Sequence, residues 1–225
     1  MQKFEMSTVT RTKSESVLVT NAVIRNTYIL LSMTLLFSAL MAFVGIITQA
    51  RPISLWFFFI AIFGLQYLIF KLRNSVWGIV TTFVFTGLLG YTLGPVINYY
   101  LHIPNGAQIV TAALGLTGAI FFALSGYAMV TRKDFSYLTG FLLSGLMIGI
   151  IALIMGIFFN IPALHLAVSS VFVLIFSGYI LHETSAMIHG GQRNYILATI
   201  SLYISIYNIF VSLLHILGAL SGRND

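Results

Sequence analysis

Cysteine and charge are both scarce in this sequence. The 225 residues contain no cysteine, which excludes disulfides, thiolate metal sites and a cysteine nucleophile. Charged residues make up only 7% of the chain, whereas a typical soluble domain has about 25%. So little charge cannot cover a surface that faces water. Together with a hydrophobic content of 59%, this composition predicts a polytopic membrane protein that lies in a lipid bilayer.

Seven apolar stretches approach or exceed the roughly 20 residues that a helix needs to cross the hydrocarbon. We expect them at about 27–48, 53–70, 76–98, 108–130, 137–159, 163–181 and 195–220. Gly94–Pro95 should kink or end the third stretch, and Pro162 suits the start of the sixth. The fold class is therefore all-α, with a polar tail at 1–26, a seven-helix transmembrane domain at 27–220 and a short stub at 221–225.

The basic residues indicate how the chain is oriented. The net charge is +6, but Lys and Arg are spread over loops and do not gather on one face, so nucleic acid is not an expected partner. Nine of the eleven lie on one side of the predicted spans, and only Arg51 and Arg223 lie on the other. Because positive charge collects on the cytoplasmic side, the N-terminal tail should be a flexible cytoplasmic segment and the C-terminus should lie outside.

Small residues indicate where helices meet. Gly90 and Gly94 are four residues apart in the third stretch, and Gly145 and Gly149 repeat that spacing in the fifth. Glycines at this interval let helix backbones approach closely in lipid, so we expect them at helix–helix contacts.

Glu183 is the acidic residue that the pattern singles out. It adjoins a predicted span with no basic neighbour in sequence, and it follows His182 at the start of a loop expected to run to Asn194. Two interpretations remain open. The carboxyl is either solvated or paired with a basic residue of the same side (Lys71, Arg73 or Arg193), or it belongs to an ion pathway.

The last apolar stretch carries a polar stripe. Its members, spaced four, three, four and three residues apart, are Ser201, Ser205, Asn208, Ser212 and His215. At about 100° per residue they fall within a wedge of roughly 80° on the helix. A helix in lipid turns such a stripe towards other helices or water, so it provides either interhelical hydrogen bonds or the wall of a narrow water path.

Catalysis finds little support. None of the five acidic residues lies in the middle of a predicted span, and His182 and His189 share a helix face without a third metal ligand nearby in sequence. Gly190–Gly191 is too short for a phosphate-binding loop. The sequence therefore predicts no catalytic residue, no metal site and no cofactor.

Several segments together resemble a known family. The segment Leu202–Phe210 and the acidic pair Glu183–Thr184 are similar to the last-span and sixth-span signatures of the Bax inhibitor family of seven-span membrane proteins. The similarity to bacterial members extends over Arg25–Tyr28, Thr86–Pro95, Thr131–Asp134, Pro162–Leu166 and Ile188–Gly191.

The resemblance implies a bundle whose seventh helix is central, in the bacterial inner membrane. It implies a regulatory protein that is not an enzyme and whose partners are the membrane protease FtsH and its associated membrane proteins. The alternative that it implies is a pH-sensitive leak of calcium or protons through two facing carboxyls, which share a proton. Glu183 matches the first position, but Ser205 stands at the second and cannot ionise in this range, which counts against that alternative.

Overall fold

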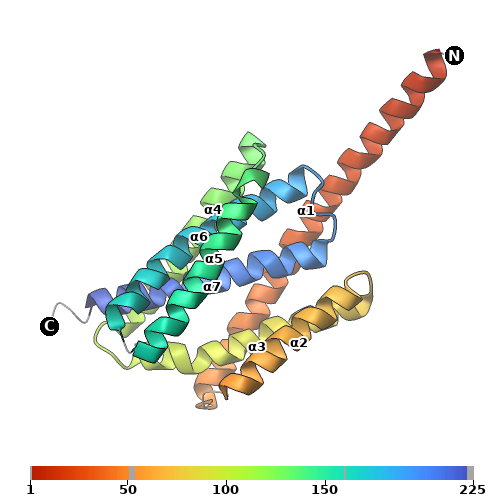
Figure 1. Ribbon diagram of the computed structural model, residues 1–225. Coiled ribbons are helices and arrows are strands. Elements are labelled where there is room, and N and C mark those ends of the chain that lie inside the picture. Colours follow the sequence, from red (N-terminus) through yellow and green to blue (C-terminus); the bar gives the residue numbers. More distant parts are fainter. Residues whose placement is uncertain (1, 51–53, 160, 222–225) are drawn as a thin grey trace.

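The computed structural model describes residues 2–50, 54–159 and 161–221, which form seven α-helices and one short 3-10 helix (Figure 1). The α-helices are α1 (Gln2–Ile47), α2 (Leu55–Leu72), α3 (Val76–Leu101), α4 (Gly106–Thr131), α5 (Thr139–Phe159), α6 (Pro162–Ile188) and α7 (Tyr195–Ser221). The 3-10 helix η1 covers Ser136–Leu138, and the described residues contain no strand. The all-α prediction is confirmed. The expected break at Arg51–Pro52, Asn160 and the stub beyond Ser221 lie outside the described residues.

Six of the helices are long and apolar enough to cross a membrane. They are α1 from Thr20 onward, α3, α4, α5 with η1, α6 and α7. The apolar part of α2, Trp56–Leu72, is shorter, because Lys71 and Arg73 close it and it begins only after the segment around Pro52. The chain is therefore an integral membrane protein with at least six segments of spanning length.

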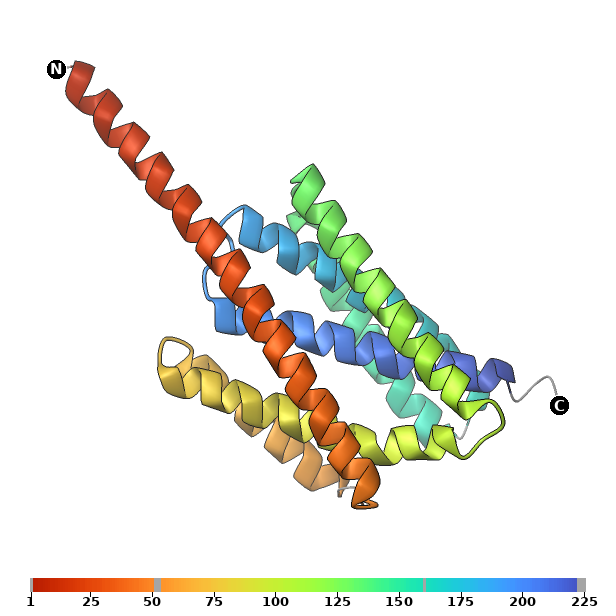
Figure 2. The ribbon, with the colours of Figure 1, turned by 180° about the vertical axis from the view of Figure 1, so that it is seen from behind.

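Helix α7 lies between two groups of helices. In Figures 1 and 2 it passes between the α2–α3 pair and the group formed by α4, α5 and α6. It contacts α1, α2, α3, α4 and α6, and within the described residues it makes no contact with α5. Leu202, Ile209 and Leu214 on α7 are completely buried, and α7 has a larger buried share than any other spanning helix. In the part of the chain that the structure describes, helix α5 packs on α6 and η1 alone.

Helix α1 begins far before the first predicted span. It runs without a break from Gln2 to Ile47, and its N-terminal part projects beyond the other helices (Figure 2). The backbone at 2–26 is thus helical, whereas the sequence led us to expect a flexible segment. The physical reason is that 2–26 contains neither glycine nor proline, so nothing interrupts the helix that continues into the membrane.

Glycines allow α1 and α3 to approach closely. A methyl group added at Gly94 would lie 2.7 Å from the Cα of Gly45 on α1, and one added at Gly90 would lie 2.7 Å from the Ser38 hydroxyl. Gly145 on α5 is similarly covered by Ile175 of α6, at 2.9 Å. These glycines lie at helix–helix contacts, as the sequence pattern indicates.

The structure decides two predictions about helix ends. Helix α3 continues through Pro95 to Leu101 and its axis changes direction part-way along (Figure 2), so of the two expected effects of Gly94–Pro95, a kink or an end, the kink is observed. Helix α6 continues past Leu181 to Ile188, which places His182 and Glu183 inside the helix and not in a loop. The signal that ends α6 is Gly190, whose φ of +75° is a left-handed conformation that suits glycine.

Candidate functional site

A polar cluster surrounds Glu183 near the C-terminal end of α6. Only 8% of the Glu183 surface is exposed, and its Oε1 atom has no hydrogen-bond partner among the residues that the structure describes. The side chains of Ser201 on α7 and Gln192 in the α6–α7 loop face its carboxyl group. Among the residues whose side chains the structure describes, no Lys or Arg forms an ion pair with it. A buried carboxyl without a cation is costly when ionised, so this group is the main functional candidate of the fold.

Thr184 connects three helices beside this carboxyl. Its completely buried hydroxyl lies 3.4 Å from the Tyr28 hydroxyl of α1 and 3.5 Å from the Ser125 hydroxyl of α4. Residues far apart in the sequence therefore meet around the Glu183–Thr184 pair. The pair that carries the sequence resemblance thus occupies a junction of α1, α4 and α6.

The next residue, Ser185, attaches the α4–α5 loop to the same end of α6. Its hydroxyl donates to the Lys133 carbonyl oxygen and accepts from the Phe135 backbone N–H, both at 3.0 Å. His182 lies on α6 seven residues before His189, and its Nε2 atom is 2.9 Å from the Thr139 hydroxyl at the end of η1. His182 therefore anchors the start of α5 and does not join the carboxyl in a shared hydrogen bond.

Asp134 is the exposed acidic group of that loop. The Ser136 backbone N–H donates to its Oδ1 atom at 2.9 Å, and this hydrogen bond holds the pKa of the Asp134 carboxyl below its ordinary value. The histidines at 182 and 189 add a smaller effect in the same direction. The side chain thus caps the entry to η1 as a carboxylate.

The predicted stripe of α7 is mostly enclosed. Ser205 and Ser212 are buried, with 2% and 4% of their surface exposed, Ser201 and Asn208 are half-buried, and His215 is exposed. The Ser205 hydroxyl donates to the Ser201 carbonyl oxygen at 2.9 Å, and the Asn208 amide donates to the Ile204 carbonyl oxygen at 2.8 Å. These groups satisfy themselves on their own helix, a pattern that requires no water path.

Sequence reasoning missed two polar residues that organise this end and the middle of the bundle. Asn194 caps α7, because its Oδ1 atom accepts from the Ile196 and Leu197 backbone N–H groups at 3.1 Å. Its amide donates to the Arg73 carbonyl oxygen at 2.9 Å, which ties the α6–α7 loop to the α2–α3 turn. Tyr203 was also missed. An asparagine directly before an apolar helix is a capping signal, whereas Tyr203 lies in the signature Leu202–Phe210 but nothing in the sequence indicates its partners.

The cluster offers a carboxyl, hydroxyls and a primary amide. Such a set can hold a proton or exchange hydrogen bonds as helices shift. Throughout the described ranges, no three metal-ligating side chains gather at one place.

Comparison with known proteins assigns the chain to a family. The family model described as "Inhibitor of apoptosis-promoting Bax1" matches residues 20–222, nearly all of the chain. The chain belongs to the Bax inhibitor family. The resemblance inferred from the sequence is thereby confirmed, and the Bax inhibitor match includes both the Glu183–Thr184 pair and the signature Leu202–Phe210.

Three bacterial proteins are similar in sequence to this chain over most of its length. The "Modulator of FtsH protease YccA" of Escherichia coli strain K12 is 50% identical over 90% of this chain and 92% of its own length. An uncharacterized protein of Pseudomonas aeruginosa is 50% identical over 90% of this chain and 91% of its own. An uncharacterized membrane protein of Vibrio cholerae is 46% identical over 96% of this chain and 97% of its own length. This Bax inhibitor family chain is thus similar to YccA along nearly its whole length.

Proposed function

We propose that this chain is a regulatory protein of the bacterial inner membrane that binds the FtsH protease, or its associated membrane proteins, and restrains degradation of membrane substrates. The observation that carries the proposal is the 50% identity to a relative named as a modulator of FtsH, over nine-tenths of both chains. The action is binding and not catalysis.

The proposal includes an arrangement in the membrane. Helix α2 is a seventh, shorter span, and α7 is the central helix around which the others pack. The N-terminal tail is cytoplasmic and the C-terminus periplasmic. Support comes from the hydrogen bonds that Asn194 and Ser185 make to Arg73 and Lys133, because these gather loops with basic residues at one end of the bundle.

Co-purification tests the binding proposal. The intact chain and a variant that lacks residues 1–20 are each extracted in mild detergent, and retained FtsH is quantified. We expect the intact chain to retain the protease. The truncated chain reports whether α1 before Asn21 contributes to the contact. Failure of the intact, folded chain to retain FtsH or any of its associated membrane proteins would refute the proposal.

A pH-sensitive leak of calcium or protons is the alternative function. One observation favours it, namely the buried Glu183 carboxyl with an unpartnered oxygen. Ser205 at the second position and the internal hydrogen bonds of the stripe weigh against it. The test is calcium and proton flux measured in proteoliposomes across a range of pH, for the parent and for Glu183→Gln. Flux equal to that of empty liposomes removes the alternative.

A further inference from the structure

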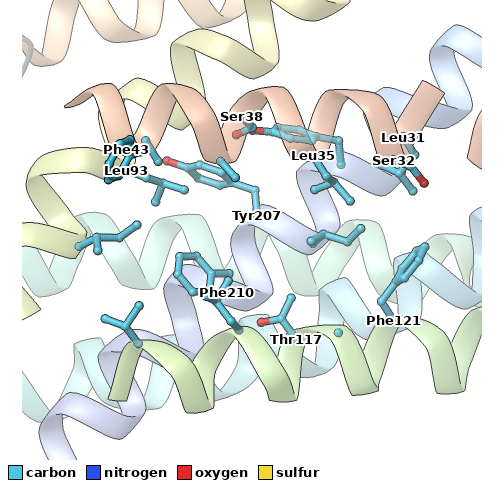
Figure 3. Close-up of a pocket in the computed structure, with 18 of the residues that line it drawn as sticks. Leu31, Ser32, Leu35, Ser38, Phe43, Leu93, Thr117, Phe121, Tyr207 and Phe210 are labelled. Carbon is cyan, nitrogen blue, oxygen red and sulfur yellow. The ribbon is translucent and has the colours of Figure 1, made fainter. Parts of the chain in front are cut away.

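A cavity of about 560 Å³ lies between α1 and α4, at the depth of the membrane spans (Figure 3). Leu31 and Leu35 of α1 form one wall, and Phe121 of α4 forms part of the other. Its floor comes from α7, where Ile206 and Phe210 are buried beneath it. We call this space the lateral cavity. It adjoins the polar cluster around Glu183 through Tyr28, but the Glu183 carboxyl does not line it.

The lateral cavity opens sideways towards the bilayer. Among the described residues the backbones of α1 and α4 stand apart, and the two helices meet through the Tyr28 and Phe121 rings, whose centroids are 6.0 Å apart, while both helices contact α7. The lining side chains at the outer edge are exposed, and they are Ser32, Ala39 and Phe43 on α1 and Leu114 and Phe122 on α4. The opening therefore faces the hydrocarbon that surrounds these two spans.

Water has few partners in this space. Six lining residues carry hydroxyl groups, and each hydroxyl already faces a partner inside the protein. The Ser32 and Thr117 hydroxyls donate to the carbonyl oxygens of Tyr28 and Ala113, at 2.8 and 2.7 Å. The remaining pairs are Ser38 with Tyr203, Tyr28 with Thr184, and Tyr207 with Thr92. A buried water needs two to four polar partners, so the cavity favours an apolar occupant.

The volume indicates a thin occupant. A helix about 10 Å wide with a 5.4 Å pitch fills roughly 400 Å³ per turn, so the cavity would hold little more than one turn of a partner helix. A spanning helix needs about six turns. An extended hydrocarbon chain is narrower and is present at this depth in every bilayer. The volume also lies within the range of small-molecule sites, about 300–1,000 Å³.

We propose that the lateral cavity binds one acyl chain of a bilayer phospholipid, inserted between α1 and α4 against the floor of α7. This ligand is distinct from the proposed protease contact. The chain would fill the space where the backbones of α1 and α4 stand apart, beside the Tyr28–Phe121 ring contact, and would separate the membrane from the hydroxyls of Ser38 and Tyr203.

Filling the cavity provides the test. Gly118 on α4 lines it, and a Cβ atom added there meets nothing within 4 Å, so Gly118→Leu introduces its side chain at the cavity wall from an open position. Gly115→Leu is the matched control on the same helix, because Gly115 is equally open but does not line the cavity. Ala39→Phe blocks the opposite wall and serves if Gly118→Leu does not fold.

The proteins are reconstituted in phospholipid vesicles that contain a phospholipid with a photoactivatable diazirine on one acyl chain. After illumination, mass spectrometry maps the labelled peptides. We expect labelling at Ile206–Phe210 in the parent and in Gly115→Leu, and a severalfold loss in Gly118→Leu and Ala39→Phe. Labelling of the exposed face of α2 should stay constant in all four proteins.

Three results would overturn the proposal. One is absence of label at Ile206–Phe210 in the parent, which includes the case where a second copy or another protein fills the space. A second is equal labelling there in Gly118→Leu, Ala39→Phe and the parent. The third is labelling by a diazirine fatty acid but not by the phospholipid. None of these readouts depends on FtsH, so failure here is distinguishable from failure of the proposed function.

Discussion

The Tyr203 hydroxyl oxygen on α7 lies 2.6 Å from the Ser38 hydroxyl oxygen on α1. The Tyr203 hydroxyl donates its own hydrogen to the Thr86 carbonyl oxygen on α3 at 3.1 Å, so Ser38 is the donor to Tyr203. One buried hydroxyl therefore joins α1, α3 and α7, and the Tyr203 side chain is almost wholly buried.

Removing that hydroxyl should destabilise the protein. In Tyr203→Phe the Ser38 hydroxyl loses its acceptor inside the bundle, which costs about 0.5–2 kcal/mol of unfolding free energy. The measurement is unfolding in detergent, followed by circular dichroism. Tyr67→Phe on α2 is the control, because Tyr67 is 69% exposed and should tolerate the same change. Equal stability of the two variants would contradict the role given to Tyr203.

The close contact of α1 and α3 gives a second prediction. Gly90→Ala places a methyl group 2.7 Å from the Ser38 hydroxyl and closer still to its carbonyl oxygen, so the helices must separate. We expect a loss of about 1–3 kcal/mol. In Gly64→Ala on α2 the added methyl meets nothing within 4 Å, and helix propensity should make that change neutral or stabilising by up to about 1 kcal/mol. The same unfolding assay compares them.

The unpaired carboxyl gives a third prediction. Glu183→Gln keeps the shape of the side chain and removes a buried charge that has no described cationic partner. Wherever the parent carboxyl is ionised, the variant should be at least as stable as the parent, by up to about 1–3 kcal/mol. Where the parent is protonated, the difference should vanish. Unfolding midpoints at several pH values measure this, and a clear loss of stability in the variant would indicate a hidden cationic partner.

Asp134 gives a prediction with a defined pH direction. Its folded-state pKa lies below the ordinary value of 3.8, because the carboxylate accepts the Ser136 N–H. The contribution to stability is therefore present above the ordinary pKa and is lost as pH falls through the folded-state pKa. Asp134→Asn should reduce this dependence while retaining an acceptor. The check is the difference in unfolding midpoint between parent and variant, followed from pH 6 downward to about pH 2.

Much of the fold could be predicted, because the length of an apolar stretch and the residues that begin or end a helix can be identified from short segments of the sequence. Pro162 begins α6 as expected, since its ring suits the first helical position. Gly94–Pro95 was expected to kink or end α3, and the helix is kinked there and continues, because neighbouring helices can support a kinked helix in a bundle. The end of α6 was placed too early, since His182 and Glu183 were taken as loop residues while the actual stop signal was Gly190.

The candidate site was only partly predictable. Glu183 was identified from its missing basic neighbour, but the hydroxyls around it come from residues 156 and 59 positions away from Thr184. Such contacts depend on which helices become neighbours, and periodicity along one helix does not contain that information. The same limit explains Tyr203, whose partners lie on α1 and α3.

Within the described ranges, helix α5 contacts the rest of the protein through α6 and η1 alone. Its tilt can therefore change without disturbing the packing of α7. A bilayer that is a few ångströms thicker or thinner imposes a mismatch that spans relieve by tilting, and the cost is smallest for a span with few neighbours. Adaptation to membrane thickness should therefore fall first on this one helix, while the contacts around α7 keep their register.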